Sequence, residues 1–256
     1  MKNKNEKKSG IPMAIIGLVL LVVVVGGAWY YSTMKTTTTP KANANVANAA
    51  KTPGIPVNAP VGAQPPNLAG SPTASVTIEE FADFQCGSCA AAHPTMNEIK
   101  AMYGSRIRFI FRHYPLAIAA HDKSYDAAVT AEAAGMQGKF WDMQNLLFTN
   151  QQAWTANPNY KQTWNEYAQK IGLDMAKFQD DVIGLAAKGR VNADMERGRA
   201  LSVNSTPTIF LNGVSVPFKD VTVSGMKALV DAELQRTSSA NQTAAPKPEA
   251  NQPSNK

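Results

Sequence analysis

Two cysteines three positions apart, Cys86 and Cys89, lie where a β-rich stretch of the chain gives way to a helical one. Residues 75–84 (SVTIEEFADF) are rich in β-branched and aromatic side chains and predict a strand. The apolar spacing over residues 86–103 predicts a helix with a kink at Pro94. A strand followed directly by a helix indicates a βαβ unit. A Cys-x-x-Cys pair at that junction indicates that the cysteines have a chemical role.

The rest of the chain supplies the elements around this unit. Residues 106–114 alternate and predict a second strand, which Pro115 ends. Residues 117–201 favour helix, and their breaks at 135–138, 157–158 and 172 indicate at least three helices. Two short strands joined by an Asn-Gly turn and a last helix follow, at 208–211, 214–218 and 225–235, the helix capped by Ser224. This β-α-β, helical, β-β-α order predicts an α/β fold: a thioredoxin fold with an inserted helical subdomain at about 117–201.

A long uncharged run precedes this domain. Residues 11–31 hold no charged side chain, and this run is long enough to cross the core of a bilayer. It ends in three aromatic residues of the kind that are enriched at membrane interfaces. Four lysines in residues 1–10 predict a cytoplasmic N-terminal tail and an exported remainder. We therefore expect a single N-terminal transmembrane helix. A cleaved signal peptide is the alternative, because Gly26 and Ala28 fit a cleavage site.

Two further segments lack the apolar residues that a packed core needs. Residues 32–70 are rich in Thr, Ala, Asn, Pro and Gly, and residues 237–256 share this character. Such compositions predict a disordered linker and a disordered tail. The folded domain is then expected over residues 71–236.

The positive charge of the chain belongs to its N-terminal flank. Residues 1–70 carry seven Lys or Arg and one Glu, whereas residues 71–236 carry 16 basic and 17 acidic side chains. The expected domain is therefore nearly neutral and has no basic stripe with interleaved aromatics. Nucleic-acid binding is excluded from the expected functions on this ground.

The position of Cys86 predicts redox chemistry. Unpaired amides and the macrodipole at a helix N-terminus stabilise a thiolate, so the Cys86 pKa should be lowered. Cys86 would then attack and Cys89 would resolve the mixed disulfide. An inert pair is one alternative, and a zinc site completed by histidines is another. Such a zinc site would have to draw on His93, His113 or His121.

Several stretches, taken in order, resemble the DsbA-like thioredoxin domains, especially their membrane-anchored or secreted bacterial branch. These are VTIEEFADFQCGSC, FRHYPL, GMQGKFWDMQNLLF, NEYAQKIGLDMAKF and STPTIFLNG, spread over about residues 70–235. One departure stands out. Gly87-Ser88 separates the cysteines where many members of the family have proline first, which leaves the preferred redox direction open.

The resemblance implies roles for individual residues. Cys86 matches the nucleophile and Cys89 the resolving cysteine, whose disulfide would be the redox centre, with no other cofactor and no metal. Thr206 and Pro207 match the substrate-binding cis-proline element, the alternative being an ordinary trans proline at the start of a strand. Glu80 matches a buried acid that relays the proton of Cys89; alternatively, this glutamate or its neighbour faces water.

The expected function is that of an extracytoplasmic disulfide oxidase anchored in the cytoplasmic membrane. Reduced or unfolded exported proteins would be its substrates, a quinone-linked membrane protein would reoxidise it, and the chain would be a monomer. Three alternatives stay open: a tethered disulfide reductase or isomerase, a non-redox peptide-binding module, and a metal carrier that uses the two cysteines and a histidine.

Overall fold

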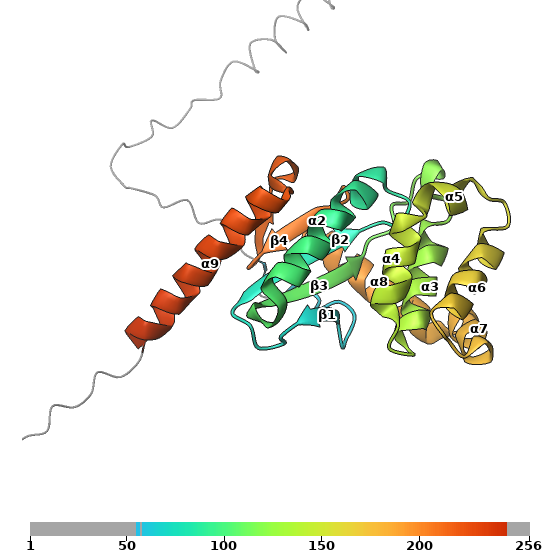
Figure 1. The fold of residues 1–256 in the computed structure, drawn as a ribbon, viewed down its shortest axis with the longest axis horizontal. Helices are drawn as coiled ribbons and strands as arrows, with labels where there is room; N and C mark the ends of the chain where they lie inside the picture. Colours follow the sequence, from blue (N-terminus) through green and yellow to red (C-terminus); the bar gives the residue numbers. More distant parts are fainter. Residues whose placement is uncertain (1–54, 57, 245–256) are drawn as a thin grey trace, which may run out of the picture. The chain divides into compact units, whose positions relative to one another are not determined.

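The computed structural model of this chain describes residues 55, 56 and 58–244 (Figure 1). In this part the strands form one mixed sheet in the order β1-β3-β2-β4-β5. Strands β2 and β3 are parallel, and the other neighbours are antiparallel. The strand bounds are β1 Asn67–Gly70, β2 Val76–Ala82, β3 Ile107–His113, β4 Thr208–Leu211 and β5 Val214–Val216.

The helices fall into two groups (Figure 1). Helices α2 and α9 pack on each other and on the sheet, whereas α3 to α8 come between β3 and β4 in the chain. Their bounds are α2 Gly87–Tyr103, α3 Ser124–Gly135, α4 Phe140–Thr149, α5 Gln151–Ala156, α6 Tyr160–Lys170, α7 Met175–Ile183, α8 Leu185–Ala200 and α9 Val223–Ala244. Short 3-10 turns occupy Gly104–Arg106, Ala119–His121 and Phe218–Asp220. This is the α/β thioredoxin fold that the sequence predicts, with further helix breaks at Asn150 and Gly184.

Strand alternation sends neighbouring side chains of β2 to opposite faces of the sheet. Glu79 points toward α8, where it accepts hydrogen bonds from Arg197. Glu80 points the other way, where its charge interacts with Lys100 of α2. The main apolar core lies on this second face and includes Ile78, Phe84, Met96, Ile99, Phe109 and Phe111. The interior is therefore built around the face that carries α2.

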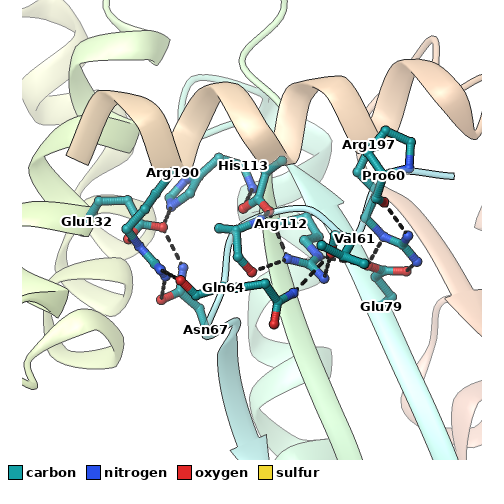
Figure 2. Close-up of polar contacts among 12 residues, drawn as sticks. Pro60, Val61, Gln64, Asn67, Glu79, Arg112, His113, Glu132, Arg190 and Arg197 are labelled. Carbon is teal, nitrogen blue, oxygen red and sulfur yellow. Dashed lines mark hydrogen bonds and ion pairs between the residues drawn. The ribbon is translucent and has the colours of Figure 1, made fainter. Parts of the chain in front are cut away.

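The expected linker ends earlier than its composition suggests. Residues 67–70, which the sequence assigns to the linker, form β1 and pair with β3. Ahead of them, Arg112 donates hydrogen bonds to the carbonyls of Val61 and Ala63, and Arg197 donates to that of Pro60 (Figure 2). The disordered assignment is thus wrong for residues 60–70. Backbone carbonyls bind this segment to distant arginines, which a search for apolar side chains does not detect.

Buried ion pairs close the sheet face beneath this segment (Figure 2). Arg112 lies 2.7 Å from Glu79 and 2.9 Å from Asp194, and all three side chains are almost fully buried. Burial opposes ionisation of Glu79, but the hydrogen bond from Arg197 and the charges of Arg112 and Arg197 outweigh it and lower the pKa. Carboxylates and guanidinium groups therefore compensate each other in this buried network.

A second ion cluster joins β3 to the insertion (Figure 2). Glu132 of α3 lies 3.0 Å from the His113 ring, contacts the Arg190 guanidinium and accepts a hydrogen bond from the Asn67 amide. Burial raises the Glu132 pKa, but His113 and Arg190 together overcome this effect and lower it to about 2. The carboxylate thus stays charged at the junction between sheet and helices.

The last helix differs from its prediction at both ends. The Thr222 hydroxyl accepts a hydrogen bond from the Gly225 amide, so Thr222 and not Ser224 caps α9. The helix runs on to Ala244, and the disordered assignment is wrong for residues 237–244. Hydroxyls of Thr237, Ser238 and Ser239 bond to carbonyls one turn back, so these polar side chains find their partners within the helix.

The other predictions for the flanks lie outside the described residues. These are the cytoplasmic tail at 1–10, the transmembrane helix or signal peptide at 11–31, the linker over 32–54 and the tail over 245–256. Within residues 55, 56 and 58–244, none of the helices combines the length and the apolar character that a bilayer crossing requires.

Candidate active site

Cys86 is the residue at which the chain enters helix α2. It occupies the N-cap position with an extended backbone, directly after the loop that follows β2. Its side chain is 8% exposed, while Cys89, one turn further on, is completely buried. Both sulfurs are free thiols in this structure, and Cys86 Sγ lies 3.2 Å from the Thr206 carbonyl oxygen. Only Cys86 is therefore open to a thiol arriving from solvent.

The surroundings divide the two sulfurs into a strong and a weak acid. A hydrogen bond from the Cys89 thiol lowers the Cys86 pKa; burial opposes this, while Thr206 and the backbone amides of Cys89 and Ser88 reinforce it. The net result is a Cys86 pKa of about 5. Burial raises the pKa of Cys89 well above its ordinary value, and the hydrogen bond and charge of Cys86 add to this. Cys86 is thus the thiolate and Cys89 the protonated thiol near neutral pH.

The residues just before Cys86 bind the loop to the start of the insertion. Buried Asp83 accepts hydrogen bonds from the Leu116 amide at 2.8 Å and from His121 Nδ1 at 2.7 Å. The Gln85 side chain accepts a hydrogen bond from the Lys123 amide. These contacts give a structural account of the Asp-Phe-Gln sequence that precedes the first cysteine.

The predicted substrate-binding pair lies across from the cysteines. The Thr206–Pro207 peptide bond is cis, so the alternative of an ordinary trans proline is wrong. Thr206 is 9% exposed, and its carbonyl contacts Cys86 Sγ. The part that both residues play in binding a substrate stays a prediction.

Glu80 lies on the α2 face of the sheet and is 2% exposed. Burial raises its pKa to about 7, against the opposing effect of the Lys100 charge. Burial likewise lowers the Lys100 pKa to about 8, while the Glu80 charge raises it. The alternative that Glu79 or Glu80 faces water is wrong, because both are buried. The proton relay to Cys89 stays a prediction. No sequence pattern indicated that the charge of Lys100, 20 residues further along the chain, would act on Glu80.

The three histidines lie in separate surroundings. His93 contacts the Asn145 and Asn97 side chains, and burial lowers its pKa. His113 pairs with Glu132, and His121 pairs with Asp83. Among the described residues, no three His, Cys, Asp or Glu side chains come together in a way that could hold a metal ion.

One polar residue near Cys86 was not singled out from the sequence. Gln151 begins α5 in the helical insertion, and its amide nitrogen lies 2.7 Å from the Phe84 carbonyl and 2.9 Å from the Cys86 carbonyl. A separation of 65 residues hides this contact from local pattern analysis. Sequence reasoning therefore found the sulfurs and missed part of what holds them.

Comparison with curated proteins finds relatives that are much longer. The chain is 35% identical over 162 residues to the Na(+)/H(+) antiporter NhaA 1 of Mycolicibacterium gilvum (strain PYR-GCK), which covers 62% of this chain and 25% of the antiporter. It is 32% identical over 165 residues to the Na(+)/H(+) antiporter NhaA of Herminiimonas arsenicoxydans, a match that covers 64% of this chain and 25% of the antiporter. The chain therefore spans about a quarter of the length of these relatives.

Solved structures share the fold. The match to BdbD from Bacillus subtilis (oxidised) has a TM-score of 0.55 at 20% identity and covers 69% of this chain and 98% of that one. The match to alpha-DsbA1 from Wolbachia pipientis has a TM-score of 0.57 at 18% identity and covers 70% of this chain and 95% of that one. The match to a thioredoxin-like oxidoreductase from Silicibacter pomeroyi DSS-3 has a TM-score of 0.53 at 24% identity and covers 65% of this chain and 91% of that one.

The family itself follows from the sequence match. The family described as Thioredoxin matches residues 62–232, a range that contains the sheet, both cysteines and the helical insertion. The solved structures with the same architecture include thiol–disulfide exchange proteins of the DsbA type. The chain therefore belongs to the family described as Thioredoxin.

Proposed function

We propose that this protein is a thiol–disulfide oxidoreductase that works as a disulfide oxidase on exported proteins. The observation that supports it most directly is the asymmetry of the two sulfurs. Cys86 keeps a small exposed fraction, 8%, and has a pKa lowered to about 5, whereas Cys89 lies completely buried one turn along the same helix. A pair of this kind is suited to reversible exchange through a mixed disulfide.

In the oxidising direction, a client thiolate attacks Cys86 Sγ of the Cys86–Cys89 disulfide. The bond between the two protein sulfurs breaks, and Cys89 leaves as a thiolate that takes up a proton because its pKa is raised. A second client thiolate then attacks the client sulfur of the mixed disulfide, and Cys86 leaves as a thiolate. The client loses two electrons, which the protein gains as two reduced sulfurs.

The direction follows from the stability of the leaving thiolate. A low pKa makes Cys86 a good leaving group and stabilises the reduced protein, which gives the disulfide oxidising power. Glu80 is proposed to exchange the proton of Cys89 in the step that forms or breaks the internal disulfide, since its pKa of about 7 allows either protonation state near neutral pH. Thr206 and Pro207 are proposed to bind the client backbone beside Cys86.

The cellular setting is part of the proposal. Residues 11–31 are proposed to anchor the protein in the cytoplasmic membrane as a single pass, with the domain on the extracytoplasmic side, where disulfides persist. Tethering would raise the effective concentration of the domain near a quinone-linked membrane protein that reoxidises it. The protein is proposed to act as a monomer. The shared quarter of the antiporter relatives gives no ground for extending ion transport to this chain.

The decisive experiment measures the reduction potential of the full chain against glutathione, with Cys86→Ser as the inactive control. An oxidase should have a potential of about −120 mV, whereas a value of about −270 mV would identify a reductase. The Cys86→Ser protein should fail to oxidise a reduced, unfolded client. Full activity of that variant would point to a non-redox binding module, and stoichiometric zinc or copper in the purified protein would point to a metal carrier.

A further inference from the structure

The side chain of Gln151 lies between the helical insertion and the loop that carries Cys86. Its Nε2 atom is within hydrogen-bond distance of two carbonyl oxygens, that of Phe84 at 2.7 Å and that of Cys86 at 2.9 Å. A glutamine amide group has two N–H donors, whereas its oxygen can only accept. Two carbonyl partners therefore fix the orientation of the amide without ambiguity, with both hydrogens directed at the loop.

These two carbonyls belong to the backbone that leads into α2. The Cys86 carbonyl also accepts the hydrogen bond from the Ala90 amide, 3.1 Å away, with which the helix begins. Between them stands Gln85, whose side chain is bonded to the start of the insertion. Gln151 thus holds the Phe84–Gln85 and Cys86–Gly87 peptide groups, which lie before and after the segment formed by Gln85 and Cys86. It thereby fixes the place where Cys86 meets the amides of α2.

The location of these bonds matters for the sulfur. Cys86 Sγ receives stabilisation from the backbone amides of Ser88 and Cys89, which works only while the sulfur faces the helix end. A carbonyl oxygen carries partial negative charge, so the carbonyls of a loop that carries a thiolate disfavour it less when donors bind them. The Gln151 amide supplies such donors from an element outside the sheet and α2.

We propose that Gln151 is a positioning residue for thiol–disulfide exchange, which fixes the Cys86 loop and offsets its carbonyl dipoles so that the reduced protein is favoured. The inference rests on the proposed function and deepens it, because it assigns the helical insertion a part in setting the redox equilibrium. Gln151 acts through the backbone and does not contact the reacting client.

The neighbouring residue provides a matched control. Gln152 lies on the same helix and is exposed, and no hydrogen bond of its side chain to the described residues is present. The experiment compares the full-length proteins Gln151→Met and Gln152→Met, and also Gln151→Glu and Gln152→Glu. Thiolate absorbance gives the Cys86 pKa, and equilibration with glutathione gives the potential.

Loss of the two donors in Gln151→Met should raise the Cys86 pKa by about one unit. The redox equilibrium should shift about tenfold toward the oxidised form, which corresponds to a potential about 30 mV more negative. Gln151→Glu, which places a carboxylate against two carbonyls, should show a larger shift in the same direction. Both Gln152 variants should stay close to the wild-type protein in both quantities.

A Gln151→Met protein that folds and keeps the wild-type pKa and potential would overturn the inference, as would equal shifts in the matched Gln152 variant. If Gln151→Met is too unstable to titrate, Gln151→Glu, which keeps the size and shape of the side chain, decides the question. A wild-type protein that performs no exchange would instead overturn the proposed function. The two failures are therefore distinguishable.

Discussion

At the scale of single residues, the site separates two chemically identical side chains by their surroundings. Cys86 receives hydrogen bonds at a helix N-terminus, and Cys89 is enclosed by the core. The same contrast separates Glu79, which guanidinium groups keep charged, from Glu80, which burial drives toward the neutral form. Protonation in this protein is thus decided by position, since the side-chain types are the same.

The rate at which iodoacetamide alkylates the reduced protein should follow ionisation of Cys86. We expect the rate to fall to half its plateau near pH 5, because the Cys86 pKa is lowered to about 5 from an ordinary value of 9.0. Measuring the alkylation rate from pH 3 to pH 8 checks this. A half-point near pH 8 or 9 would contradict the thiolate assignment.

The same lowered pKa has a consequence for stability. Ionised Cys86 favours the folded reduced state, so its contribution is fully present above about pH 9 and is lost as the pH falls to about 5. The free energy of unfolding of the reduced wild-type protein should therefore exceed that of Cys86→Ser by an amount that grows between pH 5 and pH 9. Urea unfolding at a series of pH values measures the difference, and a constant offset would contradict the prediction.

The reduction potential should depend weakly on pH in the neutral range. With Cys86 ionised and Cys89 protonated, reduction takes up one proton for two electrons. The potential should then change by about 30 mV per pH unit above pH 5 and by about 59 mV per unit below it. Glutathione equilibria at several pH values give the slope. A slope of about 59 mV through neutral pH would show that both thiols are protonated.

At the scale of elements, the sheet is closed on its α8 side by charges and on its α2 side by apolar packing. Arg112 of β3 connects Glu79 of β2, Asp194 of α8 and the carbonyls of Val61 and Ala63. One side chain thus joins two strands, a helix and the N-terminal segment. Since a buried ion that loses its partner is costly, this arginine should matter more for stability than its charge alone suggests.

Replacement of Arg112 by Met should lower the free energy of unfolding by about 3–5 kcal/mol, because it leaves Asp194 buried without a cation. Arg199→Met is the control, since Arg199 is exposed on the same α8 helix as Asp194 and should cost at most about 0.5 kcal/mol. Urea unfolding measures both. At temperatures where it stays folded, the Arg112→Met protein should keep the wild-type Cys86 pKa. The ion pairs of Arg112 lie on one face of the sheet, whereas Glu80 and helix α2, which begins just after Cys86, lie on the other.

The elements show how far sequence patterns reach. Strand alternation and helix breaks predicted β2, β3, β4 and the helical insertion, since each depends on residues close together in the chain. Strand β1 escaped prediction because it has four residues and its partner β3 lies about 40 residues away. The end of α9 escaped prediction because it is made of polar residues that usually indicate a loop, whereas the Thr237 and Ser238 hydroxyls bond to carbonyls one turn back within the helix.

At the scale of the whole molecule, the redox state should govern the stability of the domain. The fold stabilises the Cys86 thiolate that exists only after reduction, and the short Cys86–Cys89 loop restricts the unfolded chain very little. The reduced protein should therefore be more stable than the oxidised one by at least about 1 kcal/mol at pH 7, or about 3 °C in Tm. Calorimetry of both forms checks this, and a more stable oxidised form would contradict the proposed oxidase function.

The sequence by itself determined the features that depend on neighbours in the chain. These are the spacing of Cys86 and Cys89, their place between strand and helix, the order of the elements from β2 onward, the neutral domain and the uncharged run at residues 11–31. Periodicity and composition are local properties, so they can be read without coordinates. The match to the thioredoxin family over residues 62–232 agrees with that local information.

Only the tertiary structure decided which groups meet. It placed Lys100 against Glu80, Arg112 against residues 61 and 63, and Gln151 against the loop of Cys86. Burial and electrostatic coupling depend on distances between groups far apart in the chain, and no local pattern records those distances. The chemistry of Cys86 was therefore visible in the sequence, whereas the strength of its thiolate became visible only in the fold.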